Sequence, residues 1–139
     1  MSDNCQFAFA VHVLSVLALH PDAPTTSDDL AQSVNTNAVV IRRLLSQLAE
    51  AGLVESQRGP GGGTRLAKSP KKISLAQIYR ASSGEVAPFG SHPKTPAQCC
   101  TVGKSIGRVL EVVANRARVA VETEYEKTSL ADVVRKIQK

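Results

Sequence analysis

Tryptophan is absent from this chain of 139 residues, and phenylalanine and tyrosine together make up only 4% of it. Apolar residues still amount to 42%, so the core must be built from leucine, valine, isoleucine and alanine. These side chains favour helices packed on helices, and the length fits one domain with an appended helix. We therefore expect a mainly α-helical fold.

Long apolar runs are also missing. The run over residues 7–19 is shorter than the roughly 20 residues that a membrane-spanning helix needs, and it contains His12 and Ser15. The N-terminus lacks the basic start and the small-residue cleavage site of a secretory signal. We expect a cytoplasmic protein that makes no contact with a membrane.

Acidic residues are scarce in one part of the chain. Residues 42–80 contain eight lysines and arginines against only Glu50 and Glu55, a net charge of +6, whereas the whole chain carries +5. A basic stretch between nearly neutral flanks is typical of a surface that binds phosphates, although a merely solvated surface would look the same.

The spacing of apolar residues predicts helices arranged around one β-hairpin. Helices are expected at 5–20, 28–33, 38–51, 75–81, 99–127 and 130–137, and strands at 53–58 and 64–66, joined by a glycine-rich loop at 59–63. The first helix is apolar on nearly all sides and should be mostly buried. We expect Ser27 and Ser74 to cap the helices that follow them, and Gly52 to end the third helix. Three prolines make residues 82–98 a loop.

The helix expected at 99–127 is too long for one small body to cover. It would extend about 40 Å at 1.5 Å per residue. Its apolar residues recur every three or four positions from Val102 to Val121. Because a domain of this size has a radius of gyration of only ~13 Å, part of this apolar stripe should pack on a second copy. The sequence therefore predicts a homodimer formed through residues 102–125.

The order of these elements is that of a winged helix-turn-helix: helix, short helix, polar turn, helix and a glycine-tipped hairpin. The expected fold is mainly α with a small β-hairpin wing and a long C-terminal dimerisation helix. It divides into a DNA-binding domain at 1–81, a loop at 82–98 that is a candidate sensor of an effector, and the dimerisation and closing helices at 99–139.

Double-stranded DNA is the partner that this fold predicts. The third helix should enter the major groove with its N-terminal end, and the wing should meet the minor groove or the adjacent backbone. Polar and arginine side chains there can bind phosphates or base edges, and a valine can contact a thymine methyl group. The expected DNA-binding residues are Ser27, Asn35, Thr36, Asn37, Val39, Arg42, Arg43, Arg58, Gly59, Pro60, Gly61, Gly62, Gly63, Thr64 and Arg65.

The wing also carries a family signature. Gly52-Leu53-Val54, then Arg58-Gly59-Pro60-Gly61-Gly62-Gly63, then Arg65-Leu66-Ala67 closely resembles the wing of the Rrf2 family of bacterial transcription regulators, the relatives of IscR, NsrR and CymR. Residues 30–37 and 39–44 resemble its cluster-free, YwnA-like branch most. The resemblance covers nearly the whole chain. It implies a homodimeric repressor of a palindromic operator, with Arg58 as the wing arginine. The chain departs from the family at Thr64, where an aromatic residue is frequent.

Cys5, Cys99 and Cys100 are too few for a secreted disulfide framework. Family members with an iron–sulphur cluster have three spaced cysteines before the long helix, so the adjacent Cys99 and Cys100 imply that no cluster is bound. We expect no cofactor. One hypothesis is a redox switch in which oxidation links Cys5 to Cys99 or Cys100, within one subunit or between two. The alternative is three ordinary thiols.

Two other functions are compatible with the composition: a small thiol-dependent enzyme, and a winged helix that binds protein rather than DNA. A thiol enzyme needs a base beside its nucleophile, and no spacing of cysteine and histidine indicates one, so we do not expect an enzyme. His12 and His20 are expected to be core or capping residues. His92 is a candidate ligand for a metal or a small effector.

Overall fold

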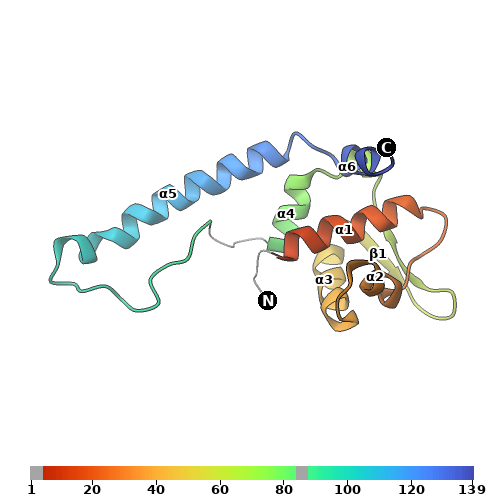
Figure 1. Cartoon of the computed structure of the whole chain (residues 1–139), viewed down its shortest axis with the longest axis horizontal. Coiled ribbons are helices and arrows are strands. Elements are labelled where there is room, and N and C mark those ends of the chain that lie inside the picture. The colour runs from red at the N-terminus through yellow and green to blue at the C-terminus, as the bar shows by residue number, and fades with distance from the viewer. Residues whose placement is uncertain (1–4, 84–87) are drawn as a thin grey trace.

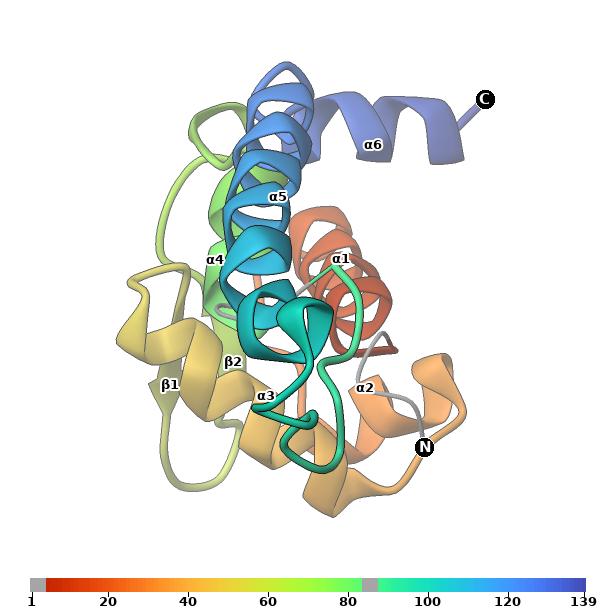
Figure 2. The ribbon, with the colours of Figure 1, turned by 90° about the vertical axis from the view of Figure 1, so that its left-hand side faces the viewer.

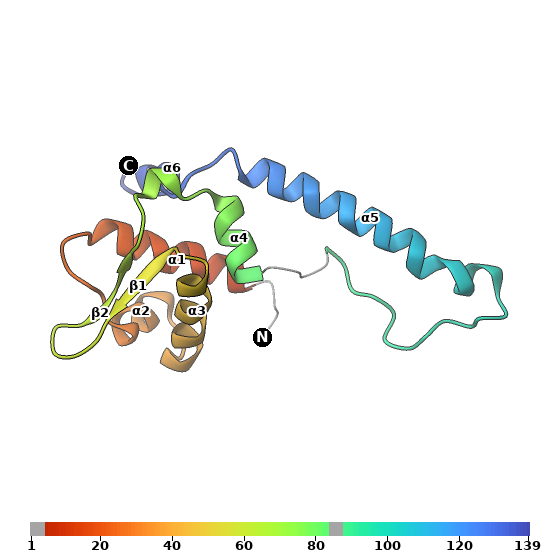
Figure 3. The same ribbon diagram turned by 180° about the vertical axis from the view of Figure 1, so that it is seen from behind.

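The computed structural model describes residues 5–83 and 88–139, which form a small body and one long projecting helix (Figure 1). The elements are α1 (Cys5–Leu19), α2 (Ser27–Val34), α3 (Ala38–Glu50), β1 (Val54–Gln57), β2 (Gly63–Leu66), the 3₁₀ helix η1 (Pro70–Lys72), α4 (Leu75–Ser83), α5 (Thr101–Tyr125) and α6 (Leu130–Ile137). The body contains every element except α5, which extends away from it, as the view from behind also shows (Figure 3).

The predicted order of helices and strands is confirmed, with small shifts at their ends. The closing helix α6 agrees at both ends, whereas α5 is two residues shorter than predicted at each end. Helix α4 continues to Ser83, so the loop predicted from residue 82 begins too early, and residues 84–87 of that loop lie outside the described residues. The sequence did not predict η1, which begins at Pro70 because proline fixes the φ angle of a first helical residue.

One hydrophobic core lies around α1, which contacts α2, α3, α4, α6 and β2. Its largest fully buried side chains are Val13, Leu14, Leu17, Leu30, Ile41, Leu44, Leu48, Leu53, Ile73, Ile78 and Leu130. Each such side chain contributes about 1.5–3 kcal/mol when it leaves water. The same core therefore fixes α3 and the hairpin relative to one another.

Helix α1 is less buried than its sequence predicts. One face lies in the core, but the other lines an open apolar groove with α6. The groove is lined by Phe7, Ala8, Val11, His12, Ser15, Val16, Leu19, Leu75, Val133 and Ile137. The prediction of a mostly buried helix is wrong for this face of a single chain, because no other part of the described chain covers it.

Three aromatic rings attach α5 to the body. Phe7 of α1 stacks on Tyr125 at the end of α5, with ring centroids 5.0 Å apart. Tyr79 of α4 meets these two rings edge-on at 5.7 and 5.5 Å. Figure 2, which looks along the molecule from the projecting end, shows α5 in front of α4 and α1. The C-terminal end of α5 is thus fixed.

The remainder of α5 is largely uncovered. Only Ala114 among its 25 residues is buried. Val102, Val109, Val112, Val113 and Val119 are all exposed. Although α5 is long, neither it nor any other helix within residues 5–83 and 88–139 is apolar enough over its length to cross a membrane.

Candidate nucleic-acid interface

Two asparagines fix the turn between α2 and α3. Asn35 adopts the left-handed conformation with φ 65°, and its N–H donates to the carbonyl of Gln32 at 3.2 Å, which ends α2. The Oδ1 atom of Asn37 accepts a hydrogen bond from the N–H of Val39 at 2.7 Å, which caps α3. Asparagine suits both positions because it tolerates the left-handed region and its side chain accepts from backbone N–H groups. Asn37 is therefore the cap of α3.

The cap of α2 is Thr26, so the prediction of Ser27 as the cap is wrong by one position. The hydroxyl oxygen of Thr26 accepts from the N–H of Asp29 at 3.1 Å, and Ser27 is the first residue of the helix. Threonine and serine are both good capping residues, so their adjacency left the choice open. The side chain of Ser27 instead lines a groove next to α3.

Helix α3 presents one polar face to solvent at its N-terminal half. Ile41, Leu44 and Leu48 face the core. Val39 and Arg43, four residues apart, lie on the opposite side and are exposed. The free N–H groups and the positive dipole end of a helix attract phosphates at this terminus.

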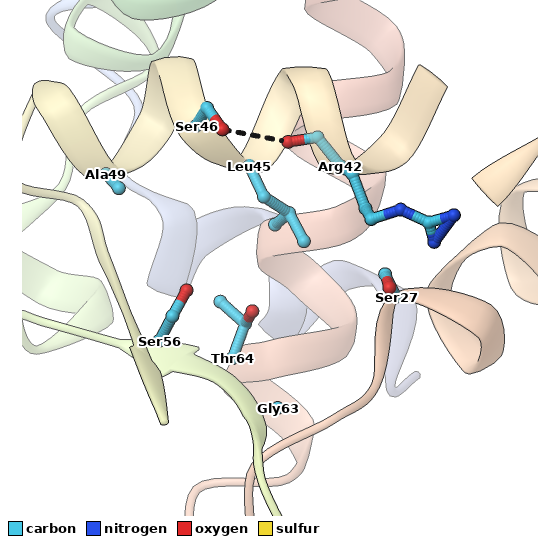
Figure 4. A pocket seen from close by; sticks show the side chains of 8 residues that line it. All are labelled: Ser27, Arg42, Leu45, Ser46, Ala49, Ser56, Gly63 and Thr64. Atoms are coloured by element: carbon cyan, nitrogen blue, oxygen red, sulfur yellow. Dashed lines mark hydrogen bonds between the residues drawn. The ribbon is translucent and has the colours of Figure 1, made fainter. Parts of the chain in front are cut away.

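A groove of about 360 Å³ separates α3 from the hairpin (Figure 4). Ser27, Arg42, Leu45, Ser46, Ala49, Ser56, Gly63 and Thr64 line it. In Figure 4 the side chain of Arg42 extends along the groove toward Ser27, and the hydroxyl of Ser46 donates to the carbonyl of Arg42 at 3.1 Å. Arg42 thus lies on the side of α3 that faces the wing, whereas Arg43 is not part of the groove.

The base of the wing is tied to the segment before α2. The N–H of Thr25 donates to the carbonyl of Thr64 at 2.9 Å, and the N–H of Thr64 donates to the carbonyl of Thr25 at 2.8 Å. Gly63 permits this approach, since a Cβ atom there would lie 2.6 Å from the carbonyl oxygen of Thr25. This bridge was not predicted, and it sets the position of the wing beside α3.

The two wing arginines, Arg58 and Arg65, do not line the groove between α3 and the hairpin. Strand pairing sets Arg65 opposite Glu55, and Arg65 Nη2 donates to Gln57 Oε1 at 3.3 Å. Arg58 is exposed in the loop between the strands, beside Gly59, Pro60 and Gly61, which are also exposed. Thr64 is only 4% exposed, so its side chain is not presented to DNA in the way the sequence predicted.

The predicted basic stretch divides into two parts. Within residues 5–83 and 88–139, no carboxylate lies within 4 Å of a basic group of Arg42, Arg43, Arg58 or Arg65. Arg80, by contrast, pairs with Glu122 of α5 at 3.9 Å and with Glu126, which follows that helix, at 4.0 Å. Lys71 and Lys72 lie in η1, which packs on α6. Among the described residues of this stretch only Arg80 therefore has an acidic partner, and α3 and the wing contribute four of the unpaired charges.

The cysteines lie at opposite ends of α5. Cys100 occupies the capping position of α5, where the nearby backbone N–H groups of Gly103 and then of Val102 lower the pKa of its thiol. Cys5 begins α1 near Phe7, which stacks on Tyr125 at the other end of α5. That helix is about 37 Å long, whereas a disulfide needs Cα atoms within about 7 Å. The predicted link between these cysteines within one chain is therefore excluded.

Two of the three histidine predictions concern α1 and the residue that follows it, His12 and His20. His12 Nε2 is 2.9 Å from the hydroxyl of Ser33 on α2, and His20 Nδ1 is 2.9 Å from the carbonyl of Val16. Both therefore have structural partners. In the part of the chain that the structure describes, no group of three or more histidine, cysteine or acidic side chains is placed to hold a metal ion.

A helix-turn-helix with a basic wing beside its second helix defines the class of winged helix-turn-helix DNA-binding regulators. The sequence matches the Rrf2 family model, described as an iron-dependent transcriptional regulator, over residues 4–136. The chain belongs to the Rrf2 family and is a DNA-binding transcription regulator. It is 38% identical over 131 residues to YwnA of Bacillus subtilis (strain 168), a candidate HTH-type transcriptional regulator, covering 94% of this chain and 96% of YwnA.

Solved structures agree with this assignment. The fold matches CymR (YrzC), the global cysteine regulator of B. subtilis, with a TM-score of 0.67 and 26% identity over 94% of each chain. A candidate DNA-binding protein matches with a TM-score of 0.69 and 36% identity, over 92% of this chain and 97% of that one. The predicted fold and family are confirmed.

Proposed function

We propose that this regulator is a repressor that binds a palindromic operator as a homodimer. The observation that carries the proposal is that the capped N-terminus of α3 and the wing lie on either side of one groove, and that both carry arginines without acidic partners. Two such units related by a two-fold axis would meet two equivalent half-sites of a duplex. Because its target is DNA, we place the protein in the cytoplasm.

In this proposal the N-terminus of α3 lies in the major groove. Asn35, Thr36 and Asn37 bind phosphates or base edges, and Val39 contacts a thymine methyl group. Arg43 points outward with Val39, and Arg42 binds the backbone on the wing side. The wing inserts Arg58 and the exposed Gly59 and Gly61 into the minor groove or beside it, with Arg65 on the outer face of the hairpin.

Substitution of Arg58 tests the proposal. The operator is first obtained by selecting bound duplexes from a random pool, and affinity is then measured by fluorescence anisotropy at several salt concentrations. We expect Arg58→Ala to lose about 1–3 kcal/mol of operator affinity and to reduce the slope of log K against log salt by about 1. Lys136→Ala, which removes an exposed charge from α6, should leave both unchanged. Equal affinity of Arg58→Ala and wild type would remove the wing from the interface.

The dimer is proposed to form through residues 102–125 of α5. The support is the exposed side of α5 that carries Val102, Val109 and Val113, which no other described element covers. Exposed apolar surface of this extent marks interaction sites in proteins of this kind. The apolar groove between α1 and α6 is a second uncovered surface that a partner subunit can fill.

The residues present do not fit an iron–sulphur cluster within one chain. Cys99 and Cys100 are adjacent, and Cys5 lies at the far end of α5. We therefore propose that this member of a family described as iron-dependent works without a cluster. No catalytic activity is proposed, since the family is one of transcription regulators.

The cysteines are proposed instead to form a disulfide between subunits. If two α5 helices pair in antiparallel orientation, the N-terminal end of one lies beside the C-terminal end of the other, where the α1 helix of that subunit begins. Cys100, with its lowered thiol pKa, would then meet Cys5 of the partner subunit. Hydrogen peroxide would oxidise the two thiols to one disulfide and be reduced to two molecules of water.

Non-reducing electrophoresis tests this link. After peroxide treatment we expect a band of twice the chain mass that dithiothreitol removes, and we expect it to be absent in Cys5→Ser and in the double variant Cys99→Ser/Cys100→Ser. Operator affinity should change on oxidation of the wild type alone. A wild type that stays monomeric on the gel and keeps its affinity would show three ordinary thiols.

A further inference from the structure

A pocket of about 250 Å³ lies between α5 and the segment that precedes it. Phe89 and His92 line it from the segment, and Leu110, Glu111, Asn115 and Arg118 line it from α5. Gly107 leaves the space open, because a Cβ atom added there would meet nothing within 4 Å. This volume lies just below the range of about 300–1,000 Å³ that is typical of ligand pockets, which suits a small molecule.

Arg118 is the polar residue of this pocket whose hydrogen bonding is incomplete. Its Nη1 donates to Asn115 Oδ1 at 3.0 Å, but its Nε is buried and has no acceptor in the described part of the chain. Nor does any carboxylate of residues 5–83 and 88–139 lie within 4 Å of its guanidinium. Buried donors are nearly always paired in folded proteins, so an acceptor from outside the described residues accounts for this one.

We propose that the pocket binds a small organic monocarboxylate with a short apolar body. The planar fork of an arginine, formed by Nε and a neighbouring Nη, matches the two oxygens of a carboxylate. Phe89, Leu110 and Ala114 supply apolar contacts for the body of the ligand. Glu111 lies in the same pocket and repels a second negative charge, so a dicarboxylate is disfavoured. The role of this ligand as an effector rests on the proposed function, but its binding does not.

The pocket and the proposed dimer face lie on different sides of α5. At 3.6 residues per turn, Gly107, Ala114 and Arg118 share one side of the helix, and Val102 and Val109 lie about 150° around it. A second copy that packs on the valines therefore leaves the pocket open. The ligand would lie beside the interface without competing for it.

Isothermal titration of the full chain in the absence of DNA tests the proposal with hexanoate as the probe. Hexanoate has one carboxylate and a chain that fits the volume. We expect one saturable site per chain, and at least tenfold weaker binding of the neutral amide hexanamide and of the dicarboxylate adipate. Absence of saturable binding of hexanoate, or equal binding of hexanamide, overturns the proposal.

Three variants locate the site. Arg118→Gln should weaken hexanoate at least tenfold, and Arg108→Gln, which changes an exposed arginine of α5 outside the pocket, should leave binding unchanged. Gly107→Leu should fill the pocket and abolish binding while favouring the helix, so a loss of folding cannot explain its effect. Circular dichroism checks that each variant is folded. Unchanged binding in Arg118→Gln or Gly107→Leu overturns the site, whatever the affinity for DNA.

Discussion

Gly63 determines how close the wing can come to the segment before α2. Its φ of 151° lies where side chains are rarely tolerated, and its Cα faces the backbone of Thr25. The neighbouring Gly62 is equally constrained by space, since a Cβ atom there would lie 2.2 Å from the carbonyl oxygen of Gln57. Two of the wing glycines therefore fix backbone positions, and the N–H of Gly62 donates within the wing to the carbonyl of Gly59 at 2.9 Å.

Gly63→Ala is expected to lower the free energy of unfolding by about 1–3 kcal/mol, because it adds both strain and a contact with Thr25. It should also weaken operator binding, since the wing would move away from α3. Urea unfolding and anisotropy measure the two effects. Gly107→Ala, the same change at an open helical position, should instead raise stability by roughly 0.5–1 kcal/mol. Similar effects from both variants would show that the Thr25 contact is unimportant.

At this scale the sequence predicted residue types better than their partners. Ser74 was correctly expected to cap α4, because a cap depends on neighbours within three residues, and its hydroxyl accepts from the N–H of Gln77 at 3.1 Å. Arg80 was counted with the phosphate-binding charges, but it pairs with two glutamates of α5 that lie more than 40 residues further along the chain. Thr64 was expected to face DNA, and its burial depends on the bridge to Thr25. Contacts between distant segments are not visible in local patterns.

Among the elements, α6 shows how a short helix is held. Ser129 and Asp132 form a reciprocal capping box with distances of 3.1 and 2.9 Å. The backbone N–H of Ser129 and then the Arg135 side chain lower the pKa of Asp132. The ionised carboxylate of Asp132 therefore stabilises the folded state at neutral pH, and this stabilisation is lost as the pH falls through the folded-state pKa. The N–H of Leu130 also donates to the carbonyl of Ile73 at 2.8 Å, which joins α6 to the start of α4.

Removal of this cap should be measurable as a loss of stability. We expect Ser129→Ala to lower the free energy of unfolding by about 0.5–2 kcal/mol, since the N–H of Asp132 loses its acceptor. Ser69→Ala is the matched control, because Ser69 occupies the capping position of η1 without a side-chain hydrogen bond. Urea denaturation followed by circular dichroism gives both values. Equal effects at the two serines would contradict the assigned cap.

The elements themselves were predicted well because their signals are local. Apolar spacing gave α3 and α6, and Gly52, with φ 76°, ends α3 as expected. The short η1 was missed because three residues carry no periodicity. The outer face of α1 was expected to be buried, since the sequence shows that a face is apolar but not what covers it.

For the whole molecule, the uncovered valines of α5 predict that a charged side chain introduced among them will dissociate the proposed dimer into monomers. We expect Val109→Glu and Val113→Glu to yield monomers at micromolar concentration, because a carboxylate buried at a two-fold interface loses its hydration. Val119→Glu places the same group on another side of α5 and should remain dimeric. Sedimentation velocity measures the mass of each variant. A dimeric Val109→Glu/Val113→Glu double variant would place the interface elsewhere.

The arrangement of the whole chain was the part that the sequence predicted least. Cys5 and Cys100 were treated as possible neighbours, and only the stacking of Phe7 on Tyr125 shows that they lie at opposite ends of α5. The pocket beside Arg118 was not predicted either, although His92 was named as a candidate ligand. It forms where a loop, whose sequence has no periodicity, meets a helix.

The attachment of α5 by three aromatic rings at one end turns a small rotation into a large displacement. A pivot of about 5° at Tyr125 would carry the distal end of this ~37 Å helix through roughly 3 Å. In a two-fold assembly, a change in the angle at which the two α5 helices cross would in turn tilt each body. In the proposed dimer, the distance between the two α3 helices would therefore change with the crossing angle of the two α5 helices, far from the DNA.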